Sequence, residues 1–455
     1  MNFVSLNPAT GRKLRSYRAS TAIELDRALS AAVAAQRAWR LESVAFRTRS
    51  LKQLGRTLLA HLPGWAALIT AEMGKPLAQS RSELEKCAAL CDFFAKRSAN
   101  FLADERPPGA PANCHVSFEP LGVILAIMPW NFPFWQVMRA AVPAIAGGNT
   151  VILKHSPNVS GCAFALQELF AAALPAHVFQ TLLLPNERVP QVLADHRIQG
   201  VTLTGSTRAG RTVGEIAGRE MKKAVFELGG SDAYIVLADA DLDHAAEVCA
   251  SARLINSGQS CVCAKRFIVV SSVRREFESR FVARMASRTV GDPTEAATDV
   301  GPLARRDLRD HLDQQVQASV KRGAKVLLGG KFIPGPGNYY APTVLTGVAP
   351  GMPAHNEELF GPVAAVISVR DETAALAAAN GSSYGLGAAI FTRNTKQGRL
   401  LARRLEAGAV FINDFVRSDP SLPFGGVKQS GHGRELSAFG LREFLNIKTI
   451  CVTKA

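Results

Sequence analysis

The sequence predicts an α/β fold with two doubly wound parallel-sheet domains and a small bridging β segment. Short apolar runs that suit buried strands recur along the chain, and each gap between them leaves room for one helix. This alternation is typical of parallel βαβ units. A Gly-Gly pair at 229–230 separates a first series of runs from a second, and 455 residues exceed the size of one ordinary core. We therefore expect two or three domains, with a hinge near that pair.

The expected elements follow in this order. Residues 20–101 show helical periodicity and predict helices that act as packing elements. Strands are expected at 123–127, 150–154, 201–204 and 224–227 in the first series, and at 234–237, 266–270, 363–369 and 409–412 in the second. After a proline-rich break at 106–111, residues 114–119 alternate like a bridging strand, and residues 445–450 alternate like an exposed one.

The charge pattern argues against nucleic-acid and membrane partners. The net charge is +15, but the basic residues are scattered and form no block. Residues 120–138 carry no charge and approach the length of a membrane-spanning helix. Pro129, Asn131 and Pro133 would interrupt such a helix, so a buried strand, a turn and a new helix are expected there.

The cysteine pattern indicates a reducing compartment. Eight cysteines lack the dense spacing of a disulfide scaffold, and no secretory leader precedes them. A cytoplasmic protein is therefore expected. Six cysteines are interpreted as structural thiols, the commoner fate of a cysteine: residues 87, 91, 114, 162, 249 and 451.

Three residues are candidates for covalent chemistry. Cys261 follows the polar run 256–260, a loop setting in which backbone N–H groups lower a thiol pKa. Glu227 ends an apolar strand, where burial raises a carboxyl pKa and suits a general base. Asn131, held between two prolines, offers an amide N–H to an oxyanion. Taken singly, the three would be a structural thiol, an ion pair at a domain junction and a turn former.

The run 201–210 predicts a phosphate-binding loop. Residues 201–204 form a strand and 205–210 a loop, and the helix that follows begins with free N–H groups that can face a pyrophosphate. The loop lacks the G-x-G-x-x-G fingerprint, and Gly-Ser-Thr also makes ordinary helix caps.

Six motifs occur in the order used by one enzyme superfamily: 129–133, 205–207, 227–230, 258–261, 358–362 and 423–433. Through them the whole chain resembles the aldehyde dehydrogenase superfamily. It is most similar to the bacterial NAD(P)-dependent succinate-semialdehyde dehydrogenase type, which has Leu-Lys-His before a Pro-Asn pair, here residues 153–158. The resemblance implies that Cys261 is the nucleophile and Glu227 the general base, with Asn131 and the Cys261 N–H as oxyanion donors.

The resemblance implies NAD or NADP as the cofactor. Its expected ligands are Trp130, Lys154, Ser156, Gly205, Ser206, Glu358 and Phe360. NAD-preferring relatives usually have a glutamate three residues after the lysine, and this chain has Pro157. Because no carboxylate there repels a 2′-phosphate, we expect NADP to be tolerated, with His155 and Arg208 as phosphate partners.

The resemblance also implies an ω-carboxylated aldehyde as the substrate, and succinate semialdehyde above all. Arg139 matches a carboxylate ligand of this branch, and a guanidinium can clamp a carboxylate with two bonds. Without the resemblance it would be a surface arginine. Arg417 and Ser418 are expected helpers, whereas Ile255 stands in place of the branch's second arginine.

Several alternatives stay open. The substrate could instead be glutarate semialdehyde or a simple aliphatic aldehyde, the acceptor could be coenzyme A, or the chain could be a non-catalytic scaffold that keeps the fold. The presence of Glu227 argues against coenzyme A, because acylating relatives generally lack that base. Cys263 suggests a regulatory disulfide with Cys261. No metal site is expected, and a homodimer or homotetramer is implied.

The resemblance divides the chain into domains. Residues 1–107 and 123–228 are expected to form the dinucleotide-binding domain, and residues 229–433 the catalytic domain. Residues 108–122 and 434–455 are expected to be bridging segments for oligomerisation.

Overall fold

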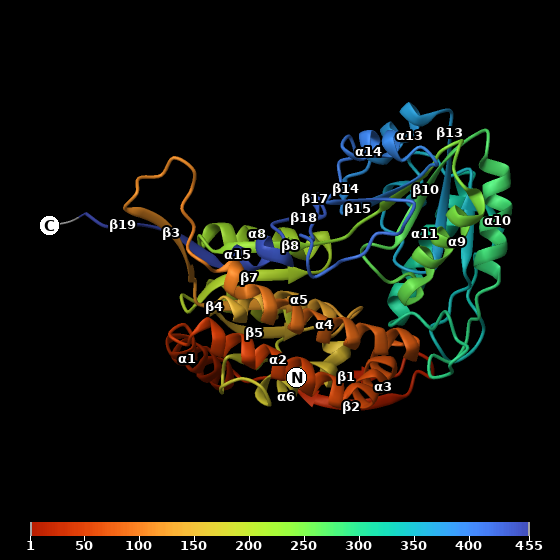
Figure 1. Ribbon diagram of the computed structural model, residues 1–455. Coiled ribbons are helices and arrows are strands. Elements are labelled where there is room, and N and C mark those ends of the chain that lie inside the picture. Colours follow the sequence, from red (N-terminus) through yellow and green to blue (C-terminus); the bar gives the residue numbers. More distant parts are fainter. Residues whose placement is uncertain (1, 454–455) are drawn as a thin grey trace.

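The computed structural model describes residues 2–453 and contains two large, mainly parallel sheets that occupy opposite halves of the molecule (Figure 1). The first sheet has the order β18-β8-β7-β4-β5-β6. Its strands are β4 (Val123–Met128), β5 (Thr150–His155), β6 (Phe179–Thr181), β7 (Ile198–Thr204), β8 (Lys223–Glu227) and the antiparallel edge strand β18 (Gly431–His432). The order reverses between β4 and β7, so a crevice opens beyond their carboxyl ends.

The second sheet has the order β11-β12-β13-β10-β9-β15-β16. Its strands are β9 (Asp232–Val236), β10 (Ala264–Val270), β11 (Lys325–Leu328), β12 (Thr343–Thr346), β13 (Val363–Val369), β15 (Gly387–Phe391) and β16 (Ala409–Ile412). All eight strands expected from the apolar runs are confirmed. Five further strands of the two large sheets were not expected: β6, β11, β12, β15 and β18. Of these, β15 reads Gly-Ala-Ala at its start, with too little apolar bulk to be recognised.

Helices cover both faces of each sheet, as the alternation of strands and helices predicts. Alternate residues of β9 show this, because Ile235 packs in one apolar cluster and Tyr234 in another on the opposite face. The helices around the first sheet and N-terminal to it are α1 (Ala22–Trp39), α2 (Val44–Ala60), α3 (Leu62–Met73), α4 (Leu77–Phe101), α5 (Trp135–Ala146), α6 (Ser160–Ala171), α7 (Val189–Ala194), α8 (Thr207–Arg219) and α15 (Ser437–Glu443). Those of the second are α9 (Leu242–Leu254), α10 (Arg274–Ala286), α11 (Arg306–Lys321), α12 (Pro353–Asn356), α13 (Glu372–Asn380) and α14 (Thr395–Ala402).

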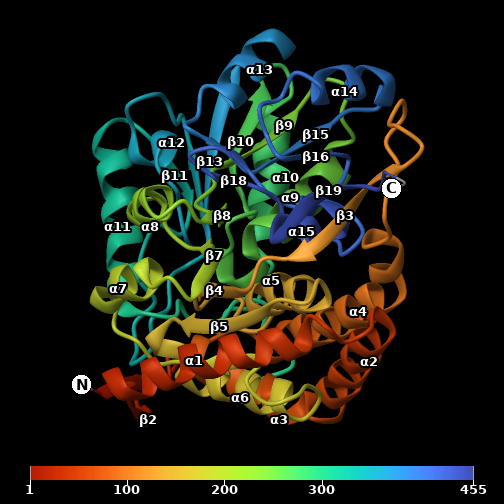
Figure 2. The ribbon, with the colours of Figure 1, turned by 90° about the vertical axis from the view of Figure 1, so that its left-hand side faces the viewer.

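The remaining strands form small two-stranded sheets. β1 (Asn2–Leu6) pairs with β2 (Lys13–Arg18), and β14 (Tyr384–Gly385) pairs with β17 (Val427–Lys428). β3 (Cys114–Pro120) pairs antiparallel with β19 (Leu445–Cys451), and together they form an arm that projects from the body (Figures 1 and 2). We refer to β3 and β19 as the arm.

A disulfide joins Cys114 to Cys451 in the arm. The expectation that both are structural thiols is therefore wrong. The cause is the register of β3 and β19, which places the two residues directly opposite each other, with Cα atoms 4.1 Å apart. The sequence could not show this pairing, because it depends on two strands that are 337 residues apart.

The boundary between the two proposed domains lies between β8 and β9, which belong to different sheets. Residues 431–432 were expected in the second domain, yet they form β18 at the edge of the first sheet. We therefore propose that the second domain ends before residue 431. Residue 1 and residues 454–455 of the proposed segments lie outside the described residues.

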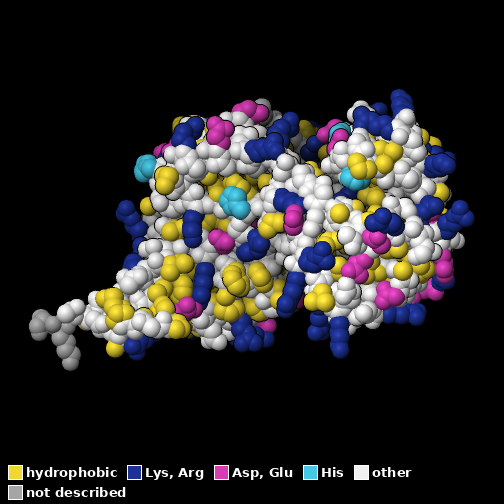
Figure 3. Space-filling view, turned by 90° about the horizontal axis from the view of Figure 1, so that it is seen from above, with side chains coloured by type: hydrophobic (Ala, Val, Ile, Leu, Met, Phe, Trp, Pro, Cys, Tyr) yellow, Lys and Arg dark blue, Asp and Glu magenta, His cyan; other side chains and the backbone are white. Residues whose placement is uncertain are grey.

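One face of the molecule shows how its charged side chains are distributed (Figure 3). Lys and Arg side chains are spread over the face seen in Figure 3 and do not gather in one patch. Among residues 2–453, no helix has both the length and the apolar character needed to cross a membrane.

Candidate active site

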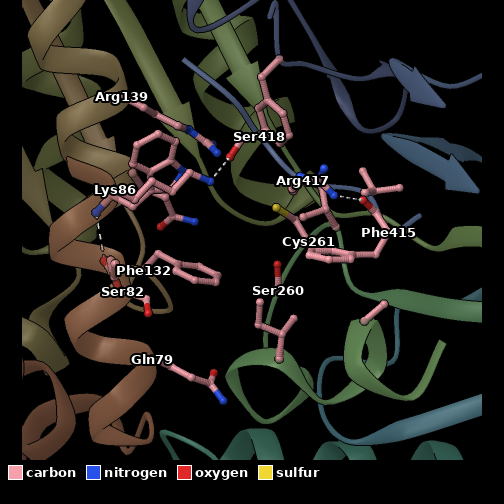
Figure 4. A pocket seen from close by; sticks show the side chains of 18 residues that line it. Gln79, Ser82, Lys86, Phe132, Arg139, Ser260, Cys261, Phe415, Arg417 and Ser418 are labelled. Atoms are coloured by element: carbon pink, nitrogen blue, oxygen red, sulfur yellow. Dashed lines mark hydrogen bonds between the residues drawn. The ribbon is translucent and has the colours of Figure 1, made fainter. Parts of the chain in front are cut away.

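Two cavities meet at Cys261. Cavity A, of about 270 Å³, is bounded by α4, α5 and the loop segments 260–262 and 415–418. Cavity B, of about 210 Å³, is bounded by the segments 129–131, 204–206 and 228–229, with Glu358 and Phe360. Cys261 and Gln136 line both cavities. The sulfur of Cys261 points toward the interior of cavity A in Figure 4.

The loop before Cys261 has an unusual backbone. Asn256, Ser257 and Gly258 have φ values of 55°, 54° and 76°, and for the first two this left-handed conformation is strained. Hydrogen bonds hold it, because the Ser257 hydroxyl accepts from the Gly301 N–H at 2.9 Å and Asn256 Nδ2 donates to the Asn131 carbonyl at 2.7 Å. A Cβ on Gly258 would lie 2.2 Å from the Gly361 oxygen, so no larger residue fits.

Asn131 is fixed by two further hydrogen bonds. Its Nδ2 donates to the Gln259 carbonyl at 3.0 Å, and its Oδ1 accepts from Gln136 Nε2 at 3.0 Å. The amide therefore keeps one N–H for a ligand in cavity B. The backbone N–H of Cys261 donates to no atom of residues 2–453, so it can act as a second donor. Two such donors suit an oxyanion that forms beside the sulfur.

The electrostatics of Cys261 keep the thiol protonated when no ligand is bound. Burial raises the pKa of Cys261 to about 12, although the nearby Arg139 guanidinium acts in the opposite direction. Formation of the thiolate therefore requires a base or an added positive charge. This differs from the lowered pKa that the loop setting suggests, because desolvation outweighs the backbone dipoles.

Glu227 lies beside Arg139 and lines neither cavity. It is 1% exposed, and its Oε2 lies 3.9 Å from Arg139 Nη2. Burial raises the pKa of Glu227 above its ordinary value of 4.5, Arg139 lowers it, and the neighbouring Glu435 raises it further. The carboxyl group thus has the raised pKa of a general base, but it reaches the sulfur only after a rotation of the side chain or through a water molecule.

Arg139 lines cavity A as expected, but neighbouring carboxylates balance its positive charge. Its Nε contacts Glu435, and its Nη2 donates to Thr204 Oγ1 at 3.3 Å. Glu435 was missed in the sequence, although it lies two residues after the motif that ends at residue 433. Arg417 and Ser418 also line cavity A, so the structure brings the three expected substrate residues together.

Helix α4 does more than pack. Its residues Gln79, Ser82, Glu83 and Lys86 line cavity A, so the prediction that the N-terminal helices only pack is wrong for α4. The spacing of three, four and seven residues places these polar side chains on one face of the helix. That polar face is the signal by which they could have been found, but it reads equally well as a solvated helix surface.

Of the cofactor residues expected around cavity B, Trp130, Gly205 and Ser206 follow the carboxyl ends of β4 and β7. Glu358 and Phe360 lie on the segment between α12 and β13. Ser206 caps α8 and its Oγ accepts from the Ala209 N–H at 3.3 Å, which leaves the helix N-terminus facing the crevice. Glu358 Oε1 accepts from the Gly230 N–H at 3.0 Å and lies 3.1 Å from Lys265 Nζ. Trp130 and Phe360 pack edge to face, with ring centroids 5.8 Å apart.

These residues fit a dinucleotide. A Cβ on Gly229 would lie 2.5 Å from Glu358 Oε2, so glycine is needed for the close approach of that carboxylate. A Cβ on Gly205 would meet only Leu203, at 3.7 Å, so the loop stays open toward a ligand. An open glycine loop, a helix N-terminus and a carboxylate suit phosphate and ribose hydroxyl groups. Cavity B would hold the nicotinamide end.

Lys154 lies near the end of β5 and Ser156 follows that strand, and both are outside the two cavities. Lys154 Nζ donates to Asn186 Oδ1 at 2.6 Å, and burial lowers its pKa to about 8. Ser156 Oγ donates to Asn158 Oδ1 at 2.7 Å. Both remain predicted ligands of the adenosine half, and the exposed Arg208 remains a predicted phosphate partner.

His155 is not placed to bind a phosphate. It is buried, and its two ring nitrogens lie 3.3 Å from the Met128 carbonyl and 2.9 Å from the Pro133 carbonyl. Burial lowers its pKa to about 4, so the ring is neutral at physiological pH. The expectation that His155 helps to bind a 2′-phosphate is wrong, because alternate strand residues face opposite sides of the sheet.

Gln136 is a positioning residue that sequence reasoning missed. Replacement of Gln136 by methionine removes the donor to Asn131 Oδ1, and we expect kcat to fall by roughly tenfold, less than the loss of an oxyanion donor itself. Steady-state kinetics with the single variants Gln136→Met and Asn131→Ala, and with the double variant, measures the coupling. Independent, additive losses would contradict this role.

Cys263 remains the predicted partner of Cys261 in a redox switch. Its sulfur contacts the Ile255 carbonyl at 3.5 Å and is buried, so it has to turn to reach Cys261. Peroxide would convert the two thiols into a disulfide and water. We expect activity lost to peroxide to return with dithiothreitol in the unmodified protein and not in Cys263→Ser. Equal recovery in both would remove the hypothesis.

The comparisons agree with this geometry. The model of the aldehyde dehydrogenase family matches residues 1–450. The chain is 48% identical to succinate semialdehyde dehydrogenase [NAD(P)+] Sad of Escherichia coli K12, over 98% of this chain and 97% of the relative. It is 45% identical to a probable succinate-semialdehyde dehydrogenase [NADP(+)] of Synechocystis, over 99% and 100%. The crystal structure of succinic semialdehyde dehydrogenase from Streptococcus pyogenes with NADP+ superposes with a TM-score of 0.96 at 34% identity, over 99% and 100% of the two chains. The protein therefore belongs to the aldehyde dehydrogenase family.

Proposed function

We propose that the protein oxidises an ω-carboxylated aldehyde, first of all succinate semialdehyde, to the carboxylic acid with NAD+ or NADP+. The observation that carries the proposal is the place of the Cys261 sulfur, where cavities A and B meet. An aldehyde in cavity A and a nicotinamide in cavity B would approach the same atom from two sides.

Each of these residues has a separate role in the reaction. The Cys261 thiol releases its proton to solvent, which Arg139 favours and the positive charge of a bound oxidised nicotinamide would favour further. The thiolate attacks the aldehyde carbon, and the Asn131 amide and the Cys261 N–H hold the oxyanion that forms. The bound nicotinamide supplies the hydride acceptor. Glu227 then accepts a proton from water, and this water releases the acid from the Cys261 thioester.

Several observations support a carboxylated substrate. Cavity A is lined by the cationic side chains of Lys86, Arg139 and Arg417 and by the Ser418 hydroxyl. The relatives described above are named for succinate semialdehyde, at up to 48% identity. Glutarate semialdehyde and simple aliphatic aldehydes remain the alternative substrates.

We further propose a homodimer or homotetramer in the cytoplasm, where the Cys114–Cys451 disulfide would be an exception to the usual reduced state of thiols. β19 pairs with β3 along one edge, and its residues 446–449 are exposed. An exposed strand edge can pair with a second chain, and we propose the arm as that contact.

The test is a panel of aldehydes assayed with NAD+ and NADP+ in parallel. We expect succinate semialdehyde to give the highest kcat/KM and free succinate as the product without coenzyme A. A higher kcat/KM for butanal, the uncharged aldehyde of equal length, would reject the carboxylated substrate. Product that forms only with coenzyme A would reject hydrolysis by Glu227.

A further inference from the structure

We infer that Lys86 binds the carboxylate of the aldehyde substrate in cavity A, beside the Ser418 hydroxyl. This inference rests on the proposed function and adds a specificity-determining residue on α4 to it.

Lys86 is held in place at the wall of cavity A. Its Nζ donates to Ser418 Oγ at 2.8 Å and lies 4.2 Å from the centroid of the Trp135 ring (Figure 4). The ammonium group thus bridges α4 and the 415–418 loop. Burial lowers the pKa of Lys86 to about 8, with a further contribution from Arg139.

The other two cations of cavity A already have carboxylate partners. Arg139 lies against Glu435 and Glu227, and Arg417 Nη1 lies 2.6 Å from Asp414 Oδ2. Within residues 2–453, no carboxylate oxygen lies within 4.0 Å of Lys86 Nζ. Among the three cations of cavity A, Lys86 is therefore the one that has no carboxylate partner in the described residues.

Among the described residues, Glu83 is the one carboxylate that lines cavity A, and its two oxygens already have other partners. Glu83 lies one turn before Lys86 on α4, and its Oε1 accepts from the N–H groups of Phe134 and Trp135 at 2.9 Å each. Its Oε2 contacts the buried Lys75. Glu83 thus fixes the start of α5 and does not serve as the partner of Lys86.

A carboxylate on the substrate would supply the missing charge. A partly buried ammonium such as that of Lys86 is disfavoured without a counter-ion, and a charge-assisted hydrogen bond to a carboxylate is among the stronger polar contacts. Cys261 lines the same cavity, so an aldehyde held at the sulfur extends its tail into the space that Lys86 faces. Lys86 would then select aldehydes that end in an anion.

The experiment compares succinate semialdehyde with butanal in three variants. In Lys86→Met we expect KM for succinate semialdehyde to rise roughly 10- to 100-fold, the usual weight of one hydrogen bond to a charged group. Values for butanal should change by less than about threefold, because butanal makes no such bond. Lys86→Arg should recover most of the loss, because the cation is kept. Lys96→Met, which removes an exposed lysine of the same helix, is the control.

The outcomes separate this inference from the proposed function. If the unmodified protein prefers succinate semialdehyde and Lys86→Met keeps that preference, Lys86 is not the ligand and the function stands. Equal losses for both aldehydes would show a structural role and overturn the inference. If the unmodified protein shows no preference over butanal, the carboxylated substrate and the inference fail together.

A measurement on the unmodified protein covers the case in which Lys86→Met does not fold. Succinate and butanoate are compared as inhibitors of butanal oxidation between pH 7 and 9.5, a range chosen around the Lys86 pKa of about 8. The other charged or titratable groups around Lys86 are Arg139 on α5, Asp419 after the loop, and Glu83 and Cys87 on its own helix. The advantage of succinate should disappear as Lys86 loses its proton. A constant advantage across the range would overturn the inference.

Discussion

Replacement of Cys261 by alanine is expected to abolish aldehyde oxidation. The sulfur is the atom that both cavities share, and no other thiol lines either cavity within residues 2–453. We expect kcat/KM to fall by at least about 10⁴-fold, as for the loss of other covalent nucleophiles. The measurement is reduction of NAD+ or NADP+ followed by absorbance, with succinate semialdehyde as the substrate.

Two controls make the result specific. Cys263→Ala removes the neighbouring thiol, which lines neither cavity, and should retain activity within about tenfold. Binding of NADPH, followed by its fluorescence, should change little in Cys261→Ala, because Cys261 is one of many residues that line cavity B. Activity close to that of the unmodified protein in Cys261→Ala would refute the covalent mechanism.

Replacement of Glu227 by glutamine should trap the acyl group on Cys261. Glutamine keeps the shape of the side chain but cannot accept a proton from water, so hydrolysis of the thioester should slow by roughly 10²- to 10⁴-fold. Attack and oxidation still proceed once, and a burst of NADH or NADPH is expected in the first turnover. Mass spectrometry of the variant after mixing should show an acyl group on Cys261. Free thiol after the burst would contradict this role.

The pH dependence of kcat tests the role of Glu227 in a second way. Because burial raises the pKa of Glu227, the carboxyl is protonated and inactive as a base at low pH, and kcat should rise as pH increases through that pKa. In Glu435→Gln a neighbouring negative charge is lost, and Arg139 becomes free to pair with Glu227. Both changes lower the pKa of Glu227, so the rise should move to lower pH. If kcat rises at the same pH in Glu435→Gln as in the unmodified protein, Glu227 does not control this rise.

The sequence was sufficient to predict those elements and site residues that the pattern of neighbouring residues determines. The run 123–127 is apolar at every position and is a buried strand, and the prolines around Asn131 mark the turn into α5. Cys261 could be chosen because polar residues and a glycine precede it, and the left-handed loop at 256–258 accounts for that composition.

What could not be predicted depends on contacts between distant residues. Whether Cys114 forms a disulfide depends on the register of β3 and β19. The direction of the Glu227 side chain depends on its attraction to Arg139. Lys86 and Ser418 are 332 residues apart, and nothing in the local sequence of α4 distinguishes a cavity lysine from a solvated one. The low pKa of His155 likewise follows from its burial, which outweighs the opposite effect of the contacts with the Met128 and Pro133 carbonyls.

The two walls of cavity A come from opposite ends of the chain, α4 on one side and the 415–418 loop on the other. Re-engineering of the enzyme for a new aldehyde therefore requires matched changes in two distant stretches of the gene. A library confined to the 415–418 loop would leave the Lys86 ammonium in place and continue to favour anionic compounds. Recombination between relatives with a single crossover would separate the two walls and yield chimeras with mismatched halves.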